Sequence, residues 1–343
     1  MSTIFLLMIL LLGFLITFQI AKASEYVGVL KGEKKNFEQN NKVNGFLMIV
    51  FLVLGLIGVW YCNELYRGKI LGESASVHGV DIDRMLYITI GITGVVFVIT
   101  QILLFWFAYK YQYSDKRKAE YFPHSNRLEV IWTVVPAIFL TVLVGFGLYY
   151  WFRITGEAPA DANQVEVTGK QFGWIFRYPG KDHTFGKKYY QNIDDGANNQ
   201  LGLLWDDPYG HDDVVTDKLY IEVLKPVKLI INSRDVIHDV GLPEFRQKMD
   251  AVPGTPTTLW FIPRFTTAEM KKQKGSDFEY EISCDQMCGK GHYTMRGLVE
   301  VVTHEQYVIW LAGQKSNYSQ VMEGKTPANA AAPDSTKKTA SIQ

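Results

Sequence analysis

Four long stretches without charged side chains mark the first half of the chain. They cover residues 1–21, 43–63, 85–109 and 130–152. Each is long enough for the ~20 apolar residues of a membrane-spanning helix. The last two end in aromatic residues, as is typical of segments whose ends lie at the lipid–water interface. We therefore predict an additional pair of spanning helices in residues 1–63 and a transmembrane hairpin in residues 64–153.

The basic residues between these stretches predict their direction, because Lys and Arg stay on the cytoplasmic side of a membrane. Residues 22–42 carry five lysines and residues 110–127 five basic residues, whereas residues 64–84 carry three. The two segments with five basic residues each, 22–42 and 110–127, are then cytoplasmic, and everything after Arg153 lies outside. Residues 4–20 could instead be a cleaved secretory signal, but the direction works only if they span.

After about residue 164 the pattern changes to short apolar runs separated by turn residues. The runs are residues 165–168, 174–178, 219–223, 227–232, 258–262, 278–282 and 298–302. This spacing predicts the strands of a β-sandwich or barrel over residues 154–303. An acidic insert at 182–217 holds eight aspartates and two lysines. It is read as a solvated loop, or as a surface that steers a basic partner.

The last 40 residues, 304–343, have a different composition. Residues 305–322 are expected to form one surface helix, and residues 326–343, rich in Ala, Thr, Pro and Lys, a disordered tail. The 343-residue chain has no net charge, which argues against nucleic acid as a partner. Its three cysteines cannot form a disulfide framework, and Cys62, at the end of an apolar run, is expected to be a small packing residue.

The other two cysteines lie in a stretch dense in metal ligands, Cys284-Asp-Gln-Met-Cys288-Gly-Lys-Gly-His292-Tyr-Thr-Met295. Thiolate, thioether and imidazole together favour copper over hard cations. His238, 46 residues before Cys284, is the candidate for a second imidazole. A disulfide or half of a zinc site are the alternatives, but zinc rarely takes a thioether. This number of donors suggests two copper ions bridged by both sulfurs.

These motifs resemble a known family. The pattern C-x3-C-x3-H-x2-M, preceded by D-V-x-H and by Lys248-Met-Asp-Ala-Val-Pro-Gly254, is similar to the binuclear copper site of cytochrome c oxidase subunit II. The resemblance covers roughly residues 86–310. It implies an α + β membrane protein, with N-terminal transmembrane helices followed by a cupredoxin-like Greek-key β-barrel. It also implies a full set of copper ligands: Cys284, Cys288, His238, His292, Met295 and the carbonyl of Gln286.

The function implied by the resemblance is that of the electron-accepting subunit of a respiratory haem–copper terminal oxidase. Cytochrome c, or a complex containing it, would reduce the copper pair. Haem in subunit I would then receive the electrons for the reduction of oxygen to water, coupled to proton translocation. No C-x-x-C-H occurs in the chain, so the donor is expected to be a separate protein. Subunit III and a bacterial plasma membrane, with the copper domain on the periplasmic side, complete the expectation.

Three further residues carry predictions from the resemblance. Glu129, in Glu129-x-x-Trp-Thr-x-x-Pro136, matches the family's start of the second helix and is a candidate for proton uptake, although boundary carboxylates are often only interfacial. Phe172 and Trp174 are candidates for electron input, with Phe172 standing where the family has tryptophan. Gln286 replaces the family's glutamate, so a magnesium site at the subunit I contact is doubtful, because magnesium favours anionic oxygen.

Two other functions fit the sequence less well. A copper storage or delivery protein would need neither the Glu129 motif nor the motif that begins at Lys248. A quinol-oxidase relative of the same fold would lack the copper donors, which are all present here. Both alternatives are therefore weaker than the oxidase subunit.

Overall fold

The computed structural model describes residues 2–69, 71–114 and 116–324. The chain forms two compact units. One comprises Met1–Leu71 and Tyr87–Val142, and the other Gly72–Leu86 and Leu143–Gln343. The predicted disordered tail, residues 326–343, lies outside the described residues.

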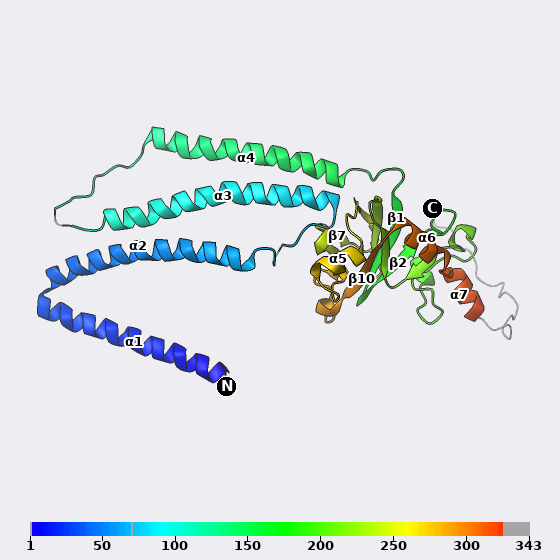
Figure 1. Cartoon of the computed structure of the whole chain (residues 1–343), viewed down its shortest axis with the longest axis horizontal. Coiled ribbons are helices and arrows are strands. Elements are labelled where there is room, and N and C mark those ends of the chain that lie inside the picture. The colour runs from blue at the N-terminus through cyan, green and yellow to red at the C-terminus, as the bar shows by residue number, and fades with distance from the viewer. Residues whose placement is uncertain (1, 70, 115, 325–343) are drawn as a thin grey trace, which may run out of the picture. The chain divides into compact units, whose positions relative to one another are not determined.

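Four long helices precede the strands along the chain (Figure 1). They are α1 (Ser2–Lys31), α2 (Glu33–Tyr66), α3 (Val77–Lys110) and α4 (Asn126–Thr155). Each is long and apolar enough to cross a membrane. The helices contain residues 2–21 of the first predicted stretch and all of the other three. Cys62 on α2 is exposed within this chain, as are most residues of that apolar helix, so its role as a packing residue stays a prediction.

The basic segment at residues 22–42 is helical on both sides of one turn. α1 continues to Lys31 and α2 begins at Glu33, with Gly32 between them at a φ of +81°. Lys, Glu, Gln and Ala favour helix even where no apolar stripe is present. Gly32 can adopt the positive φ at low cost because it has no Cβ.

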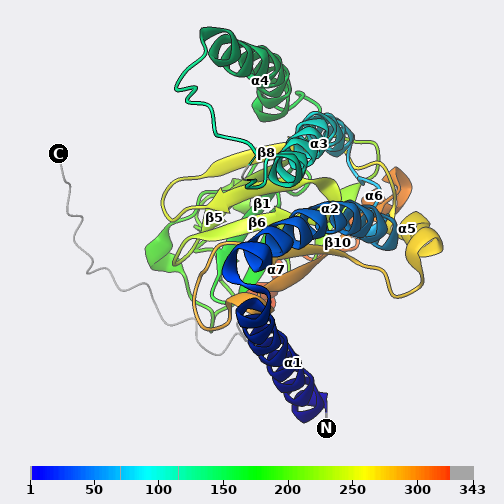
Figure 2. The same ribbon diagram turned by 90° about the vertical axis from the view of Figure 1, so that its left-hand side faces the viewer.

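In the described part of the second unit, ten strands form two five-stranded sheets. The first sheet has the order β3 (Val214–Thr216), β2 (Gly173–Tyr178), β1 (Asn163–Lys170), β5 (Val227–Ser233) and β8 (Thr257–Phe261). The second has the order β4 (Leu219–Glu222), β10 (Arg296–Val302), β9 (Tyr280–Cys284), β6 (His238–Leu242) and β7 (Gln247–Ala251). Figure 2 shows β1, β5 and β8 side by side. β1 and β5 are parallel, as are β4 and β10. Parallel neighbours cannot be joined by a tight hairpin, so the chain crosses between the sheets. The predicted cupredoxin-like fold is confirmed.

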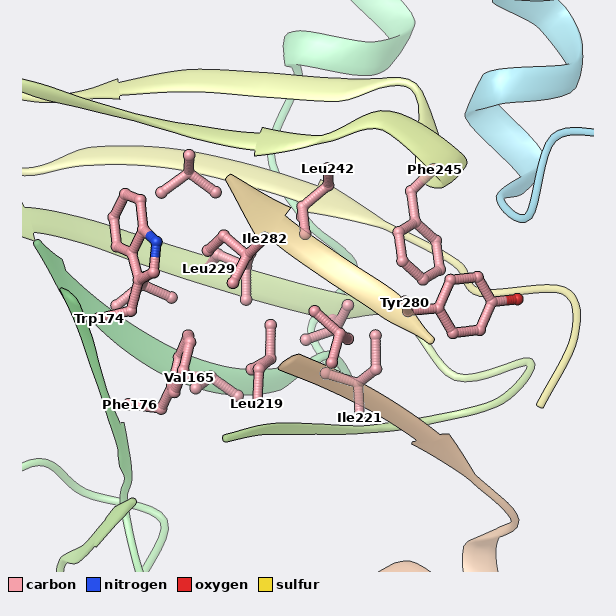
Figure 3. Packing of buried hydrophobic residues seen from close by; sticks show 14 of the residues in the cluster. Val165, Trp174, Phe176, Leu219, Ile221, Leu229, Leu242, Phe245, Tyr280 and Ile282 are labelled. Carbon is pink, nitrogen blue, oxygen red and sulfur yellow. The ribbon is translucent and has the colours of Figure 1, made fainter. Parts of the chain in front are cut away.

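The core lies between the two sheets (Figure 3). Val165 and Phe176 of the first sheet and Leu219 and Ile282 of the second are each at most 1% exposed. They belong to one apolar cluster that also contains three of the predicted metal ligands, Cys284, Cys288 and Met295. The predicted metal-binding stretch from Cys284 to Met295, here called the metal loop, is therefore anchored in the core of the domain.

The start of α3 packs on this domain. The backbone N–H groups of Ala75 and Val77 donate to the carbonyls of Glu244 (2.8 Å) and Ile262 (3.0 Å). The Ser76 hydroxyl donates to the Phe245 carbonyl at 2.6 Å.

The domain also contains a short helix, α5 (Thr267–Lys274), which begins with a capping box between Thr266 and Glu269.

The acidic insert is folded, which corrects its reading as a solvated loop. Leu201 and Leu203 are buried with Ile175 in a small second apolar cluster. Six of the eight aspartates accept a hydrogen bond or form an ion pair within the domain. They are Asp182, Asp194, Asp195, Asp207, Asp212 and Asp213. Among the described residues, Asp206 and Asp217 alone of these aspartates have no side-chain partner. Apolar residues scattered among aspartates gave no periodic signal, so the sequence did not indicate this cluster.

The C-terminal region forms two helices, α6 (His304–Ala312) and α7 (Asn317–Gly324). The single helix predicted for residues 305–322 is wrong because the chain leaves the helix at Gly313, a residue that favours helix ends. α7 then packs on the insert. The Asn317 N–H donates to the Asp213 carbonyl at 2.8 Å, and the Tyr318 ring stacks on His211 with centroids 4.0 Å apart.

Candidate metal centre

The metal loop connects β9 to β10 and is closed at its base. Cys284 is the last residue of β9, and its backbone N–H donates to the Met295 carbonyl at 3.2 Å. This bond brings the two ends of the twelve-residue motif together. His238 is the first residue of β6, and β6 pairs with β9 through Val240 and Cys284. Sheet pairing thus brings His238 to the loop across 46 residues of sequence.

Five side chains and one carbonyl of the predicted ligand set converge there. The two Sγ atoms of Cys284 and Cys288 are 3.8 Å apart. Cys284 Sγ lies 3.8 Å from His238 Nδ1 and 3.1 Å from the Gln286 carbonyl oxygen. Cys288 Sγ lies 3.7 Å from His292 Nδ1 and 3.8 Å from Met295 Sδ. Every predicted donor is therefore adjacent to one of the two sulfurs.

The donor set fits soft metal ions and not a disulfide. A disulfide needs its sulfurs at about 2.05 Å, far less than the separation here. In the part of the chain that the structure describes, His238, Cys284 and Cys288 form the one group of three or more His, Cys or carboxylate side chains whose ligand atoms all lie within 4.8 Å of one another. Two thiols, two imidazoles and a thioether are the ligands that copper accepts most readily.

Burial shapes the chemistry of the thiols. Cys284 and Cys288 are 7% and 4% exposed, and His238 is fully buried. Burial raises the pKa of the Cys288 thiol to about 11, with a further contribution from the neighbouring Cys284. Since only the thiolate binds a metal, metal binding must release protons from this pair. We infer that the site takes up metal more readily as pH rises.

A second layer of hydrogen bonds orients the ligands. Asp235 Oδ1 lies 2.7 Å from His238 Nε2, which leaves Nδ1 facing Cys284. The Gln171 N–H donates to Asp235 Oδ2 at 2.7 Å, and the Gln171 side-chain amide donates to the Cys288 carbonyl at 2.6 Å. Partial burial alone would raise the pKa of Asp235, but these hydrogen bonds lower it overall. Asp235 therefore stays anionic beside the imidazole, as metal-binding histidines commonly require.

Two glycines allow the close packing around the ligands. A Cβ on Gly169 of β1 would lie 2.9 Å from the His238 ring, and one on Gly291 would lie 2.5 Å from the Phe172 ring. Neither position has space for a side chain. The β1 backbone and the Phe172 ring thus cover the site from the side of the first sheet.

The two predicted residues for electron input differ in their surroundings. Trp174 is only 5% exposed, and its ring meets His238 edge-on with centroids 6.1 Å apart. Phe172 is 41% exposed and lies against the loop at Gly289 and Gly291. Trp174 therefore packs behind a ligand, whereas Phe172 reaches solvent.

The remaining predicted residues lie at less enclosed positions. Glu129 is exposed in the first turn of α4, in the other structural unit. The Gln286 side chain is exposed, although its carbonyl faces Cys284. Asp285 next to it forms an ion pair with Lys248 at 2.8 Å.

The roles of Gln171 and Asp235 in orienting the ligands were missed from the sequence. For Asp235 a signal was present, because a carboxylate three residues before a histidine ligand can fold back to its ring. For Gln171 no local signal exists. Its contact with Cys288 crosses 117 residues.

Comparison with known proteins gives consistent matches. The family profile described as "Cytochrome C oxidase subunit II, transmembrane domain" matches residues 71–149, and that of the "periplasmic domain" matches residues 164–302. The chain is 36% identical over 237 residues to "Alternative cytochrome c oxidase subunit 2" of Bradyrhizobium diazoefficiens, covering 68% of this chain and 80% of the relative. It is 28% identical over 228 residues to "Cytochrome c oxidase subunit 2" of Cereibacter sphaeroides, covering 64% and 71%.

Among solved structures, the chain is similar to the periplasmic domain of subunit II of cytochrome oxidase (CoxB) of Bradyrhizobium japonicum. The identity is 24% and the TM-score 0.31, over 46% of this chain and 95% of that one. The two profiles cover α3, most of α4 and the metal loop. The chain therefore belongs to the cytochrome c oxidase subunit II family.

Proposed function

We propose that this subunit II of a haem–copper oxidase accepts electrons from a c-type cytochrome at a binuclear copper site and passes them to haem in subunit I. The family establishes that the chain works with subunit I in an oxidoreductase complex. The electron path is our proposal. The observation that carries it is the convergence of four further donors on two thiol sulfurs that lie 3.8 Å apart.

The residues around the site suit such a role. Bound copper would supply one-electron transfer. Cys284 and Cys288 would hold the ions between them, with His238, His292, Met295 and the Gln286 carbonyl completing the set. Because the ligands come from paired strands and a loop anchored in the core, they are held rigidly, and a rigid site needs little rearrangement when its charge changes. Burial keeps water from the sulfurs.

The test is the metal content and spectrum of the purified oxidase. We expect two copper ions per chain beyond the copper of subunit I, an electron-spin spectrum delocalised over both, and reduction of the site by horse heart cytochrome c. Zinc at the site, or a single copper with a one-nucleus pattern, would contradict the proposal.

The copper domain would lie on the periplasmic side of a bacterial plasma membrane, with subunit III in the complex.

Replacement of Asp235 is expected to weaken copper binding while leaving the fold intact. Without this carboxylate the His238 ring loses its hydrogen bond at Nε2, so both its orientation and its basicity change. Loss of such a partner costs roughly 10- to 100-fold in metal affinity. Copper retention during titration with a chelator would measure this for Asp235→Asn. The control is Asp217→Asn, an exposed-loop change without a described side-chain partner, and equal retention in the two variants would rule out the role of Asp235.

Glu129→Gln is expected to slow oxygen consumption by about tenfold, or ~1.4 kcal/mol in the barrier, with the copper spectrum unchanged. The reason is that a neutral amide cannot take up protons for subunit I. Turnover of the assembled oxidase gives the measurement. Glu120→Gln, an exposed glutamate that lies earlier in the chain, is the matched control. A Glu129→Gln enzyme as fast as this control would end the proton-uptake proposal.

Magnesium at the contact with subunit I is expected to be weak or missing, with the copper pair normal. Gln286 offers a neutral oxygen where magnesium favours a carboxylate, and the neighbouring Asp285 is already paired with Lys248. Metal analysis of the purified complex would measure occupancy. Gln286→Glu should raise magnesium retention. Tight magnesium in the wild type that Gln286→Ala does not loosen would show that this position is irrelevant.

A further inference from the structure

We propose that the Tyr293 ring is the surface contact through which the donor cytochrome delivers its electron. This rests on the proposed function and adds a residue to it. The partner is a c-type cytochrome that presents an apolar haem edge. The inference comes from which side chains next to the ligands reach the surface.

The ligands themselves are closed off from a partner. His238, Cys284, Cys288 and Met295 are at most 7% exposed, so a docking protein must approach through residues beside them. Three large apolar side chains directly adjacent in sequence to a ligand are exposed: Ile237 at 45%, Met287 at 73% and Tyr293 at 93%. Tyr293 is the most exposed of the three, and it is an aromatic residue of the kind enriched in protein interfaces.

Tyr293 combines this exposure with a fixed backbone. It lies in the short 3-10 turn His292–Thr294. The His292 N–H donates to the Gly289 carbonyl at 3.1 Å, and the Thr294 N–H donates to the Gly291 carbonyl at 3.0 Å. The turn is thus held while the ring has no hydrogen bond or ring contact among the described residues. A partner would meet a side chain whose base is already ordered, which lowers the entropy cost of binding.

The position of Tyr293 gives a short path to the site. One peptide unit separates it from His292, whose Nδ1 lies 3.7 Å from Cys288 Sγ. The two residues expected from the family pattern are placed differently. Trp174 is buried behind His238, and Phe172 packs against Gly291 and exposes less than half the fraction that Tyr293 does. We therefore assign Phe172 to covering the loop and Tyr293 to contacting the donor.

The aromatic side chain also suits the role energetically. Tyrosine is enriched among the few residues that dominate protein interfaces, where truncation commonly costs more than tenfold in affinity. Met287 is the sharpest alternative, since it is next to Cys288 and is also well exposed. Its neighbour Gln286 is the residue expected at the contact with subunit I, so Met287→Ala is the matched comparison.

The experiment uses the purified complete oxidase with horse heart cytochrome c as the probe. Calorimetry gives the dissociation constant of the cytochrome for copper-loaded and metal-free complex, and stopped-flow absorbance gives the rate of electron input. Hexaammineruthenium(II), a small reductant that needs no docking surface, gives the rate that depends on the site alone. We expect Tyr293→Ala to weaken binding in both forms and to slow input from cytochrome by about tenfold or more. Reduction by hexaammineruthenium(II) should stay unchanged.

The variants separate the possible failures. Tyr293→Phe should keep the wild-type values because the contact is made by the ring, and a loss as large as that of Tyr293→Ala would overturn this. Met287→Ala and Phe172→Ala should change binding less than Tyr293→Ala. Wild-type binding and rates in Tyr293→Ala would overturn the inference and leave the proposed function standing. A wild-type oxidase that takes no electrons from the cytochrome would overturn both.

Discussion

Cys284→Ser is expected to remove the copper pair and to reduce electron input from cytochrome c to background. A serine hydroxyl is a harder, far less acidic donor than a thiol and does not replace a soft thiolate. Cys284 is also next to three of the other donors, with Cys288, His238 and the Gln286 carbonyl all within 3.8 Å of its sulfur. Since the loss of an outer partner alone costs up to ~100-fold in metal affinity, the loss of a direct ligand should exceed this.

The measurements are copper content and the electron-spin spectrum of the purified complex. Cys62→Ser is the matched control, because it makes the same chemical change at an exposed position of α2 and should keep both properties. A Cys284→Ser protein that retains two coppers with a delocalised spectrum would show that the sulfurs do not bridge the ions. Retained haem in subunit I would show that the complex had assembled.

The metal site could be predicted from sequence because its donors are dense and chemically distinctive. Five of the six donor residues lie within twelve residues of loop, where no tertiary information is needed to bring them together. His238 could be added because its motif was distinctive, although only the pairing of β6 with β9 explains its approach. The hydrogen bond from Gln171 to the Cys288 carbonyl could not be predicted, because it depends on how β1 and β2 turn over the loop.

The fold was predictable where a strong apolar pattern met a regular element. The four long helices and seven of the ten strands were found in this way. β7, Gln247–Ala251, was missed because a mostly polar sequence forms a strand only through pairing with β6. β6 itself, His238–Leu242, contains Asp and Gly yet is buried throughout. The predicted single C-terminal helix is wrong because α6 ends at Gly313 and a separate helix, α7, begins at Asn317 and packs on the insert.

A buried charge cluster joins the insert to the barrel and is the basis for the second large prediction. Arg177 of β2 is 2% exposed, with its Nε 3.3 Å from Glu166 and 3.4 Å from Asp213. The same guanidinium donates to the Gly186 carbonyl at 2.6 Å, and Lys188 forms an ion pair with Glu166. Burial raises the pKa of Asp213 to about 6, against the attraction of Arg177. Arg177 and the Gly186 N–H thus favour the charged form of Asp213, which burial disfavours.

Arg177→Met is expected to lower the free energy of unfolding of the barrel by ~3–5 kcal/mol, the usual cost of removing one partner from a buried ion pair. The corresponding fall in melting temperature is on the order of 10 °C for a domain of this size. Tryptophan fluorescence during heating of the purified protein gives the measurement. The matched control is Arg296→Met. Arg296 pairs with Glu281 on the exposed surface, where the loss should be ~0–1 kcal/mol.

The pH dependence of this deficit tests whether its origin is electrostatic. The pKa of Asp213 is higher in the folded than in the unfolded state, so the folded state binds the extra proton and this group's contribution to stability falls as pH rises through about 6. Without Arg177 the charged carboxylate is costlier still, and protonation relieves more of the cost. The deficit of Arg177→Met should therefore be larger at pH 7.5 than at pH 5. An equal deficit at both values would contradict the electrostatic origin and assign the loss to packing of the side chain beside Phe185.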